Sequence, residues 1–329
     1  MTKRTSGILL FWARLLVSAA ILVLLLRGLD AKRVGTSLLA SNPLNLVVAV
    51  ALLGLQVPVM NLRWVLIMKA AGAALAKGPA MRILLISFWF NQALPSSLGG
   101  DAVRVWLLRE RGIEWGPAVR GVLADRLTAL FGLIVIICAG FPFLIARIHN
   151  PAAIITVGTL ALMGITGMAS LATLDYWPAA ILAIKPISSF VRLGALTRFL
   201  LFRYRHRATV LTFALLIHVL TIVACLMLAW GIDAPLSTLD AFILVPPVIL
   251  LSALPISISG WGVREGAMVA MLTLAGITPE AALSVSVLLG LAAAAIGVVG
   301  GIVWVTGRDR EKFTEEQVED VARHTIAAD

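Results

Sequence analysis

The amino-acid sequence contains long apolar blocks, each about as long as a helix that crosses a membrane. They lie at 8–26, 43–66, 117–146, 152–174, 208–230 and 279–305. A helix needs about 20 apolar residues to cross the hydrocarbon core of a bilayer. The blocks are continuous and do not alternate with polar residues, which favours helices over a β-barrel. The sequence therefore predicts an all-α polytopic membrane protein with about six full spans.

The composition agrees with this fold class and argues against several functions. Of the 329 residues, 60% are hydrophobic and only 13% are charged, whereas about a quarter of a soluble domain is charged. The net charge of +10 is interpreted as the basic excess of cytoplasmic loops, because no aromatic residues interleave with a basic stripe as nucleic-acid binding would require. The two cysteines and four histidines have no metal-ligand spacing. We expect no metal, no cofactor and no nucleic-acid partner.

Basic loops predict the orientation of the chain. Lys3 and Arg4, the interval 175–207, and the start of the charged tail 307–329 are assigned to the cytoplasm. The acidic loop 231–240 is then outside, and both termini are cytoplasmic. The basic loop 27–42 disagrees with this assignment and is outvoted by the other three signals.

A sequence phrase near residue 95 is repeated near residue 255. Residues 91–104 read NQALPSSLGGDAVR and residues 251–264 read LSALPISISGWGVR, so that Pro, Ser, Gly and Arg recur in register. Short apolar stretches flank both phrases, at 83–94 and 101–110 and at 241–254 and 263–275. A proline interrupts a helix, and glycines permit tight turns. We therefore predict two re-entrant helical hairpins, with their turns at Pro95, Gly99, Gly100, Pro255, Gly260 and Gly262.

The number of spans between the phrases places the two hairpins on opposite faces of the membrane. Counting from a cytoplasmic N-terminus, the first hairpin begins and ends inside and the second begins and ends outside. This is an inverted repeat, a common architecture of secondary transporters. We expect one transmembrane domain at 1–306, with halves at about 1–147 and 152–306.

Charged residues in apolar segments are costly, so those in this chain are candidates for function. Arg104 and Arg264 end the two phrases and offer planar forks for phosphate or carboxylate oxygens. Asp101 and Glu265 stand beside them and are expected to orient them. The helix restarts would add backbone N–H groups, with hydroxyl groups from Ser97 and Ser257. The alternative is that each arginine pairs with its own carboxylate and only closes the bundle.

Other polar residues in the apolar blocks have less specific interpretations. Asp125 and Arg126 are adjacent on a helix and therefore need partners on other elements. Arg63, next to Trp64, is interpreted as an interfacial anchor. His218 is expected to be a hydrogen-bonded interior residue. The series Ala293, Gly297 and Gly301 predicts a close helix contact.

Three motifs carry a resemblance to a known family. They are NxxLPxxxGGDxxR at 91–104, the pair Asp125–Arg126, and LPxSxxGxGxRE at 254–265. Together they resemble the lysylphosphatidylglycerol synthase transmembrane family, the flippase-like region of bacterial multiple-peptide-resistance proteins, over about 8–305. The matching positions are Asn91, Pro95, Gly99, Gly100, Asp101, Arg104, Asp125, Arg126, Pro255, Gly260, Gly262, Arg264 and Glu265.

The resemblance implies a protein of the bacterial inner membrane that moves, or helps to modify, an anionic or aminoacylated lipid. The sequence runs to Asp329 without an aminoacyl-transferase domain, so we do not expect this chain alone to aminoacylate a lipid. The leading hypothesis is a lipid transporter that binds a head-group phosphate between the hairpins. The alternatives are a membrane-embedded transferase for lipid or polyprenyl phosphates in glycolipid or hopanoid synthesis, with Asp101 or Glu265 as base, or an accessory subunit. A lipid-modifying enzyme or a second copy of the chain is a further possible partner.

Overall fold

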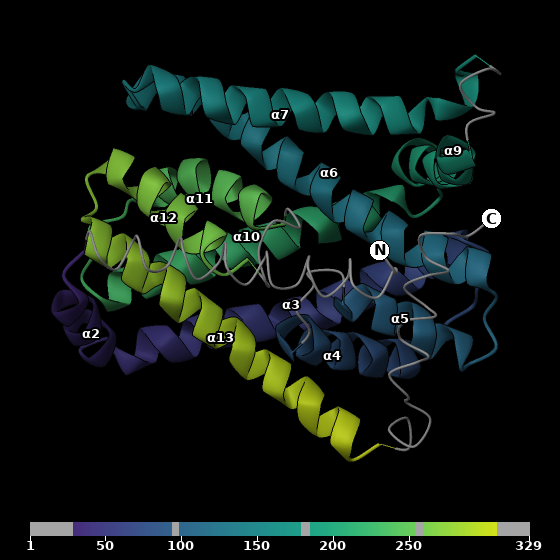
Figure 1. Cartoon of the computed structure of the whole chain (residues 1–329), viewed down its shortest axis with the longest axis horizontal. Helices are drawn as coiled ribbons and strands as arrows, with labels where there is room; N and C mark the ends of the chain where they lie inside the picture. The colour runs from purple at the N-terminus through teal and green to yellow at the C-terminus, as the bar shows by residue number, and fades with distance from the viewer. Residues whose placement is uncertain (1–28, 94–98, 179–184, 254–259, 308–329) are drawn as a thin grey trace, which may run out of the picture.

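The computed structural model describes residues 29–93, 99–178, 185–253 and 260–307, and these ranges form helices and no β-strand. The long helices run along an elongated bundle (Figure 1). They are α3 (Pro43–Ala70), α6 (Trp115–Arg147), α7 (Pro151–Ala172), α10 (Arg207–Gly231) and α13 (Pro279–Val305). All five are long and apolar enough to cross a membrane, which confirms the all-α polytopic fold. The expected span at 8–26 and the tail from 308 onward lie outside the described residues.

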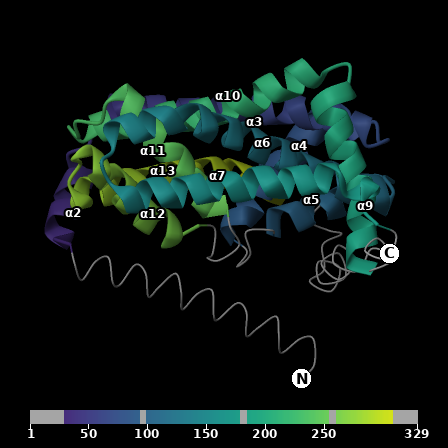
Figure 2. The ribbon, with the colours of Figure 1, turned by 90° about the horizontal axis from the view of Figure 1, so that it is seen from above.

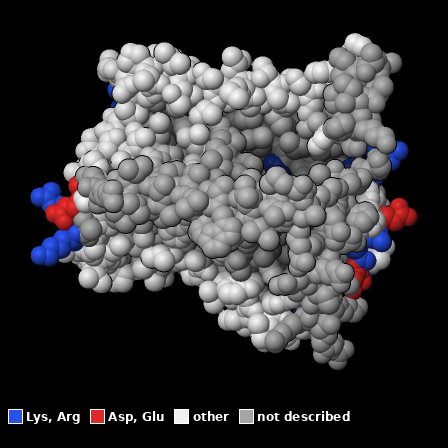
Figure 3. All heavy atoms as spheres, in the orientation of Figure 1, with Lys and Arg blue, Asp and Glu red and all other residues white. Residues whose placement is uncertain are grey.

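Among the described residues visible on the face in Figure 3, the charged side chains lie mainly at the two ends of the long axis, apart from a basic group in a hollow between them. Large apolar side chains are exposed along the helices between the ends, among them Leu55 on α3, Val135 on α6, Leu162 on α7 and Val298 on α13. Exposed apolar area of this extent is expected where lipid, and not water, surrounds the protein.

Two helical hairpins lie toward opposite ends of the bundle, as Figures 1 and 2 show. The first consists of α4 (Lys77–Ala93) and α5 (Gly99–Arg109), and the second of α11 (Thr238–Ala253) and α12 (Val263–Leu272). The inner arms have 11 and 10 residues, or about 15 to 17 Å of helix, which is about half of a 30 Å core. The outer arms are longer than expected, with 17 and 16 residues, because α4 begins at Lys77 and not near residue 83, and α11 begins at Thr238 and not near residue 241.

The helix contacts of one half recur in the other half. The helix α4 packs on α13 as α11 packs on α6, and α5 packs on α6 as α12 packs on α13. The most extensive contact joins α3 to α10, which are counterparts of each other. Because the related hairpins come from opposite ends, the arrangement is the inverted repeat that the repeated phrase predicts.

Two short helices mark the ends of the bundle and serve here to name them. The helix α2 (Ala31–Leu39) lies at one end and α9 (Lys185–Arg198) at the other (Figure 1). The interval 175–207, expected only to be polar, thus contains a helix, followed by a π-helical turn, η2 (Phe199–Arg203).

Arg198 at the end of α9 forms a salt bridge with Asp175, which follows α7. The distance from its Nη1 to Oδ1 of Asp175 is 2.6 Å. This hydrogen bond holds the pKa of the Asp175 carboxyl below its usual value.

Small residues bring α13 into close contact with α4. A Cβ atom added at Gly300 would lie 1.9 Å from the backbone oxygen of Leu85, and one at Gly301 would lie 2.9 Å from the ring of Trp89. Gly297 similarly faces Gln92 and Phe88. The contact face expected from Gly297 and Gly301 is therefore present, and its tightest point is Gly300.

We predict that Gly300→Ala lowers the thermal stability of the purified protein. The added methyl group has no space beside the α4 backbone, and overpacking of this kind costs about 1–3 kcal/mol. Gly54→Ala on α3 is the matched control, because nothing lies within 4 Å of its added Cβ. A melting curve followed by intrinsic fluorescence measures both. Equal melting temperatures for the two variants would contradict the packing described for α13 and α4.

We also predict that the two ends of the bundle face opposite sides of the membrane. Ala74 precedes α4 and Thr238 begins α11, and both are exposed. In a background with Cys138 and Cys225 replaced by alanine, we expect a membrane-impermeant maleimide to label only one of Ala74→Cys and Thr238→Cys in intact cells. The other should react only after permeabilisation. Labelling of both in intact cells would contradict the inverted repeat.

Candidate functional site

The first hairpin contributes to a buried charge network centred on Asp125 of α6. Arg63 on α3 reaches one carboxylate oxygen of Asp125 at 2.9 Å through its Nη2, and its Nε donates to the same oxygen at 3.0 Å. Arg104 on α5 donates to the other oxygen at 2.9 Å. All three side chains are at most 5% exposed. One carboxylate therefore joins three helices through two guanidinium groups.

Asp101 extends this network toward the surface. It accepts a bond at 3.5 Å from Arg104, one turn along α5, and a bond from Nε of Arg126 on α6. The side chain of Arg126 is 37% exposed, the largest value in the network. Asp125 and Arg126 thus find partners on other helices, as their adjacency requires. Among the described residues, this network therefore joins three arginines through two aspartates.

The indole of Trp64 is part of the same cluster. The guanidinium carbon of Arg104 lies 4.0 Å from the centroid of this ring, a cation–π contact. Trp64 is fully buried and Arg63 beside it is 1% exposed. The interpretation of Arg63 as an interfacial anchor is therefore wrong, because its guanidinium is held inside the bundle by Asp125.

The start of α5 is fixed by a contact with α4. The Asn91 side-chain oxygen accepts the Gly100 N–H at 3.0 Å. A Cβ added at Gly100 would lie 2.4 Å from the backbone oxygen of Ser87. Gly99 and Gly100 are the first residues of α5 and do not have positive φ. Glycine is needed at position 100 for close approach, therefore, and not for the turn that the sequence suggested.

The second hairpin contains a smaller cluster, in which Arg264 pairs with Glu265. Glu265 on α12 accepts the Gly262 N–H at 2.6 Å with one oxygen, and bonds from Arg264 at 2.7 Å and Ser286 at 3.1 Å with the other. The guanidinium carbon of Arg264 also lies 4.7 Å from the centroid of the Trp261 ring, a second cation–π contact. Gly260 and Gly262 have φ of +81° and +86°, so these two glycines do make the expected turn.

Some predicted residues remain without a structural description, and others have only a structural role. Pro95, Ser97, Pro255 and Ser257 lie outside the described residues. The His218 ring lies 2.8 Å from the carbonyl oxygen of Ala129, which fits the expected interior position. No cluster of three or more His, Cys, Asp or Glu side chains suitable for a metal occurs in the part of the chain that the structure describes.

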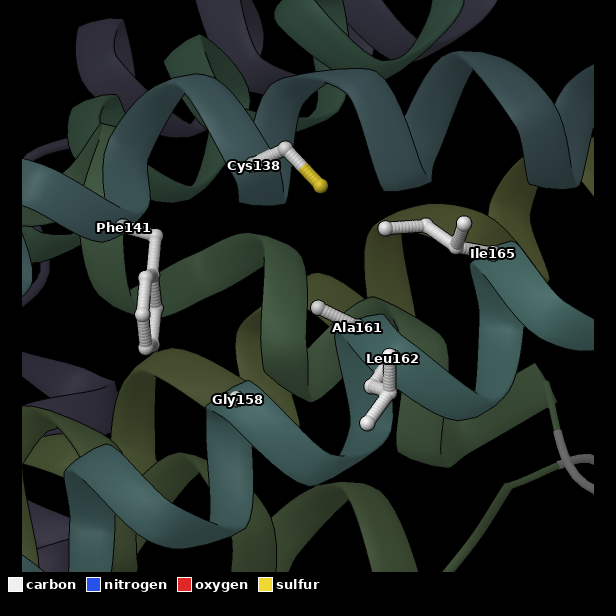
Figure 4. Close-up of a pocket in the computed structure, with 6 residues that line it drawn as sticks. All are labelled: Cys138, Phe141, Gly158, Ala161, Leu162 and Ile165. Atoms are coloured by element: carbon white, nitrogen blue, oxygen red, sulfur yellow. The ribbon is translucent and has the colours of Figure 1, made fainter.

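An apolar pocket of about 260 Å³ lies apart from both charge clusters, between α6 and α7. Figure 4 shows its wall, in which Cys138 and Phe141 come from α6 and the other residues from α7, namely Gly158, Ala161, Leu162 and Ile165. None of these side chains carries a charge. The pocket therefore has no chemistry to recognise a head group, and the charge clusters are the candidate site.

Comparison with known families agrees with the geometry. Residues 11–301 match the family described as the lysylphosphatidylglycerol synthase transmembrane region. The chain belongs to this family. A search of curated proteins found no match. The match covers both hairpins and both charge clusters of this chain.

We predict that Asp125→Asn strongly destabilises this transmembrane region. The change leaves Arg63 and Arg104 buried without their shared counter-charge, and breaking a buried pair in this way costs about 3–5 kcal/mol. Asp175→Asn is the control, since it breaks a pair whose side chains are about 28% exposed, where little stability is lost. Thermal unfolding in detergent measures both. Similar melting temperatures for the two variants would show that Asp125 does not hold the helices together.

Proposed function

We propose that the chain moves a lipid with an anionic head group between the leaflets of the bacterial inner membrane. The observation that carries the proposal is a buried cluster of arginines that share Asp125, built on one of two hairpins that lie toward opposite ends of an apolar bundle. A phosphate oxygen is the complement of such a cluster, because guanidinium forks bind it bidentately. The two hairpins give each end of the bundle its own helical element, an arrangement that suits alternating access.

We place the α9 end of the bundle in the cytoplasm. The described residues at this end include most of the basic side chains that lie outside the charge clusters, namely Lys69, Lys77, Arg82, Arg109, Arg111, Arg120, Arg192, Arg198, Arg203, Arg205 and Arg207, against the acidic Glu110, Glu114 and Asp175. The α2 end has Lys32, Arg33 and Arg147, together with Asp30, Asp233, Asp240 and Glu280. An excess of Lys and Arg in cytoplasmic loops supports this orientation, with Ala74 inside and Thr238 outside.

A transport role fits these contacts better than a transferase role does. A general base needs a lone pair directed at the proton that it removes. Both oxygens of Glu265 accept hydrogen bonds from the protein, and the carboxylate is fully buried. Asp101 is held by Arg104 and Arg126. An enzyme that supplies the lipid, or a second copy of the chain, remains compatible with the transport proposal as a partner.

The proposal predicts that the purified protein, reconstituted into liposomes, exchanges a labelled phosphatidylglycerol between leaflets. Arg104→Lys and Arg264→Lys should each abolish the exchange, because an ammonium group keeps the charge but loses the fork. Arg109→Lys is the matched control. It lies on α5 with Arg104, but it bonds the carbonyl of Ile113 at the end of the hairpin.

One result would overturn the proposal. It is a rate of phosphatidylglycerol exchange that is the same with the wild-type protein as in liposomes without protein, although the melting curve shows that the protein is folded. Normal exchange by folded Arg104→Lys and Arg264→Lys would show that the arginines only close the bundle.

A further inference from the structure

The two hairpins differ in the anion that their arginines face. In the second hairpin a carboxylate of the protein already fills the position, because Glu265 accepts both the N–H of Gly262 before α12 and a bond from Arg264. Ser286 donates to the same carboxylate at 3.1 Å. Arg264 thus has its counter-charge within the chain.

The first hairpin has no such carboxylate at the corresponding position. With Arg104 aligned to Arg264, the residue in register with Glu265 is Val105. The N–H of Gly100 is bonded by the neutral amide oxygen of Asn91. Arg63 and Arg104 together have about ten N–H donors, whereas the buried carboxylate that they share, Asp125, offers about four lone-pair sites. The donors of these two arginines therefore outnumber the sites of their shared acceptor.

Three buried donors of this cluster have no hydrogen-bond partner. They are Nη1 of Arg63, Nε1 of Trp64 and Nε of Arg104. The only other buried side-chain nitrogen or oxygen atom without a hydrogen-bond partner in the described part of the chain is the amide oxygen of Asn61. The three donors belong to one cluster, because both arginines bond Asp125 and Arg104 stacks on Trp64. A buried donor without an acceptor costs free energy, and an added acceptor would recover it.

We infer that the first half-site alone binds the anionic group of the ligand, a phosphate oxyanion, through Arg63, Trp64 and Arg104. Glu265 occupies the equivalent place in the second half, so that Arg264 serves the movement of its hairpin and not the capture of the anion. The inference deepens the proposed function and rests on it for the identity of the lipid. Arg126, 37% exposed, is the member of the network that an incoming oxyanion meets first.

The test is a binding titration that does not depend on transport. The purified full chain in neutral detergent is titrated with phosphatidylglycerol, with phosphatidylcholine and with inorganic phosphate, and binding is read from the shift of the melting temperature. We expect phosphatidylglycerol to stabilise the wild type more than phosphatidylcholine does. Arg63→Lys should weaken phosphatidylglycerol binding by about tenfold or more, the loss expected for a charged hydrogen bond.

Matched substitutions of the two tryptophans keep the test independent of folding defects. Trp64→Phe removes the N–H but keeps an aromatic ring beneath Arg104, and we expect it to weaken binding. Trp261→Phe makes the same change beneath Arg264 and should leave binding as in the wild type. Arg264→Lys should also retain binding, although we expect it to lose exchange in liposomes.

The outcomes separate this inference from the proposed function. Equal weakening of phosphatidylglycerol binding by Trp64→Phe and Trp261→Phe would overturn the inference that the two half-sites differ. Loss of binding only in Arg264→Lys would do the same. Neither result would contradict the proposed transport. Absence of anion-dependent stabilisation in the wild type would overturn the inference as well. Binding that depends on Arg63 without any exchange would keep the inference and overturn transport. Full stabilisation by inorganic phosphate alone would identify free phosphate as the ligand and keep the oxyanion site.

Discussion

A guanidinium group inside an apolar bundle needs an acceptor, and Asp125 supplies it for two arginines at once. Its carboxylate joins α3, α5 and α6, so the inner arm of the first hairpin is attached to two long helices by charge. Removing two charges from water is expensive, and the attraction between them repays this only with good geometry and further hydrogen bonds. The bonds of 2.9 to 3.0 Å to both carboxylate oxygens meet that condition.

The inverted repeat uses one backbone arrangement for two different chemistries. Each hairpin carries an arginine that stacks on an indole, Arg104 on Trp64 and Arg264 on Trp261. In one half the carboxylates come from α5 and α6, and in the other from α12 itself. Beside Arg264 the long helix α13 has Gly290, where an added Cβ would lie 2.3 Å from the guanidinium. The symmetry of the fold therefore does not require equal sites.

The sequence could predict the features that depend on length, order and adjacency. Span length gave the fold class, the repeated phrase gave the hairpins, and adjacency on a helix required separate partners for Asp125 and Arg126. It could not place Arg63, because a residue near the end of an apolar block fits an interface and an interior equally well. The role of Gly100 was missed for a related reason. Its close approach to Ser87 depends on how α4 packs on α5, and no local pattern encodes that distance.

Unsatisfied donors connect binding to movement. Nη1 of Arg63, Nε1 of Trp64 and Nε of Arg104 are buried without an acceptor, and a buried donor without an acceptor costs free energy. A phosphate oxygen bound there would accept from them. The cluster with a bound head group is then the form that apolar helices can enclose at the lower cost. For a chain with one such half-site, this difference alone would favour rearrangement of the hairpins with lipid bound over rearrangement without it, and no second anion site is needed to obtain that preference.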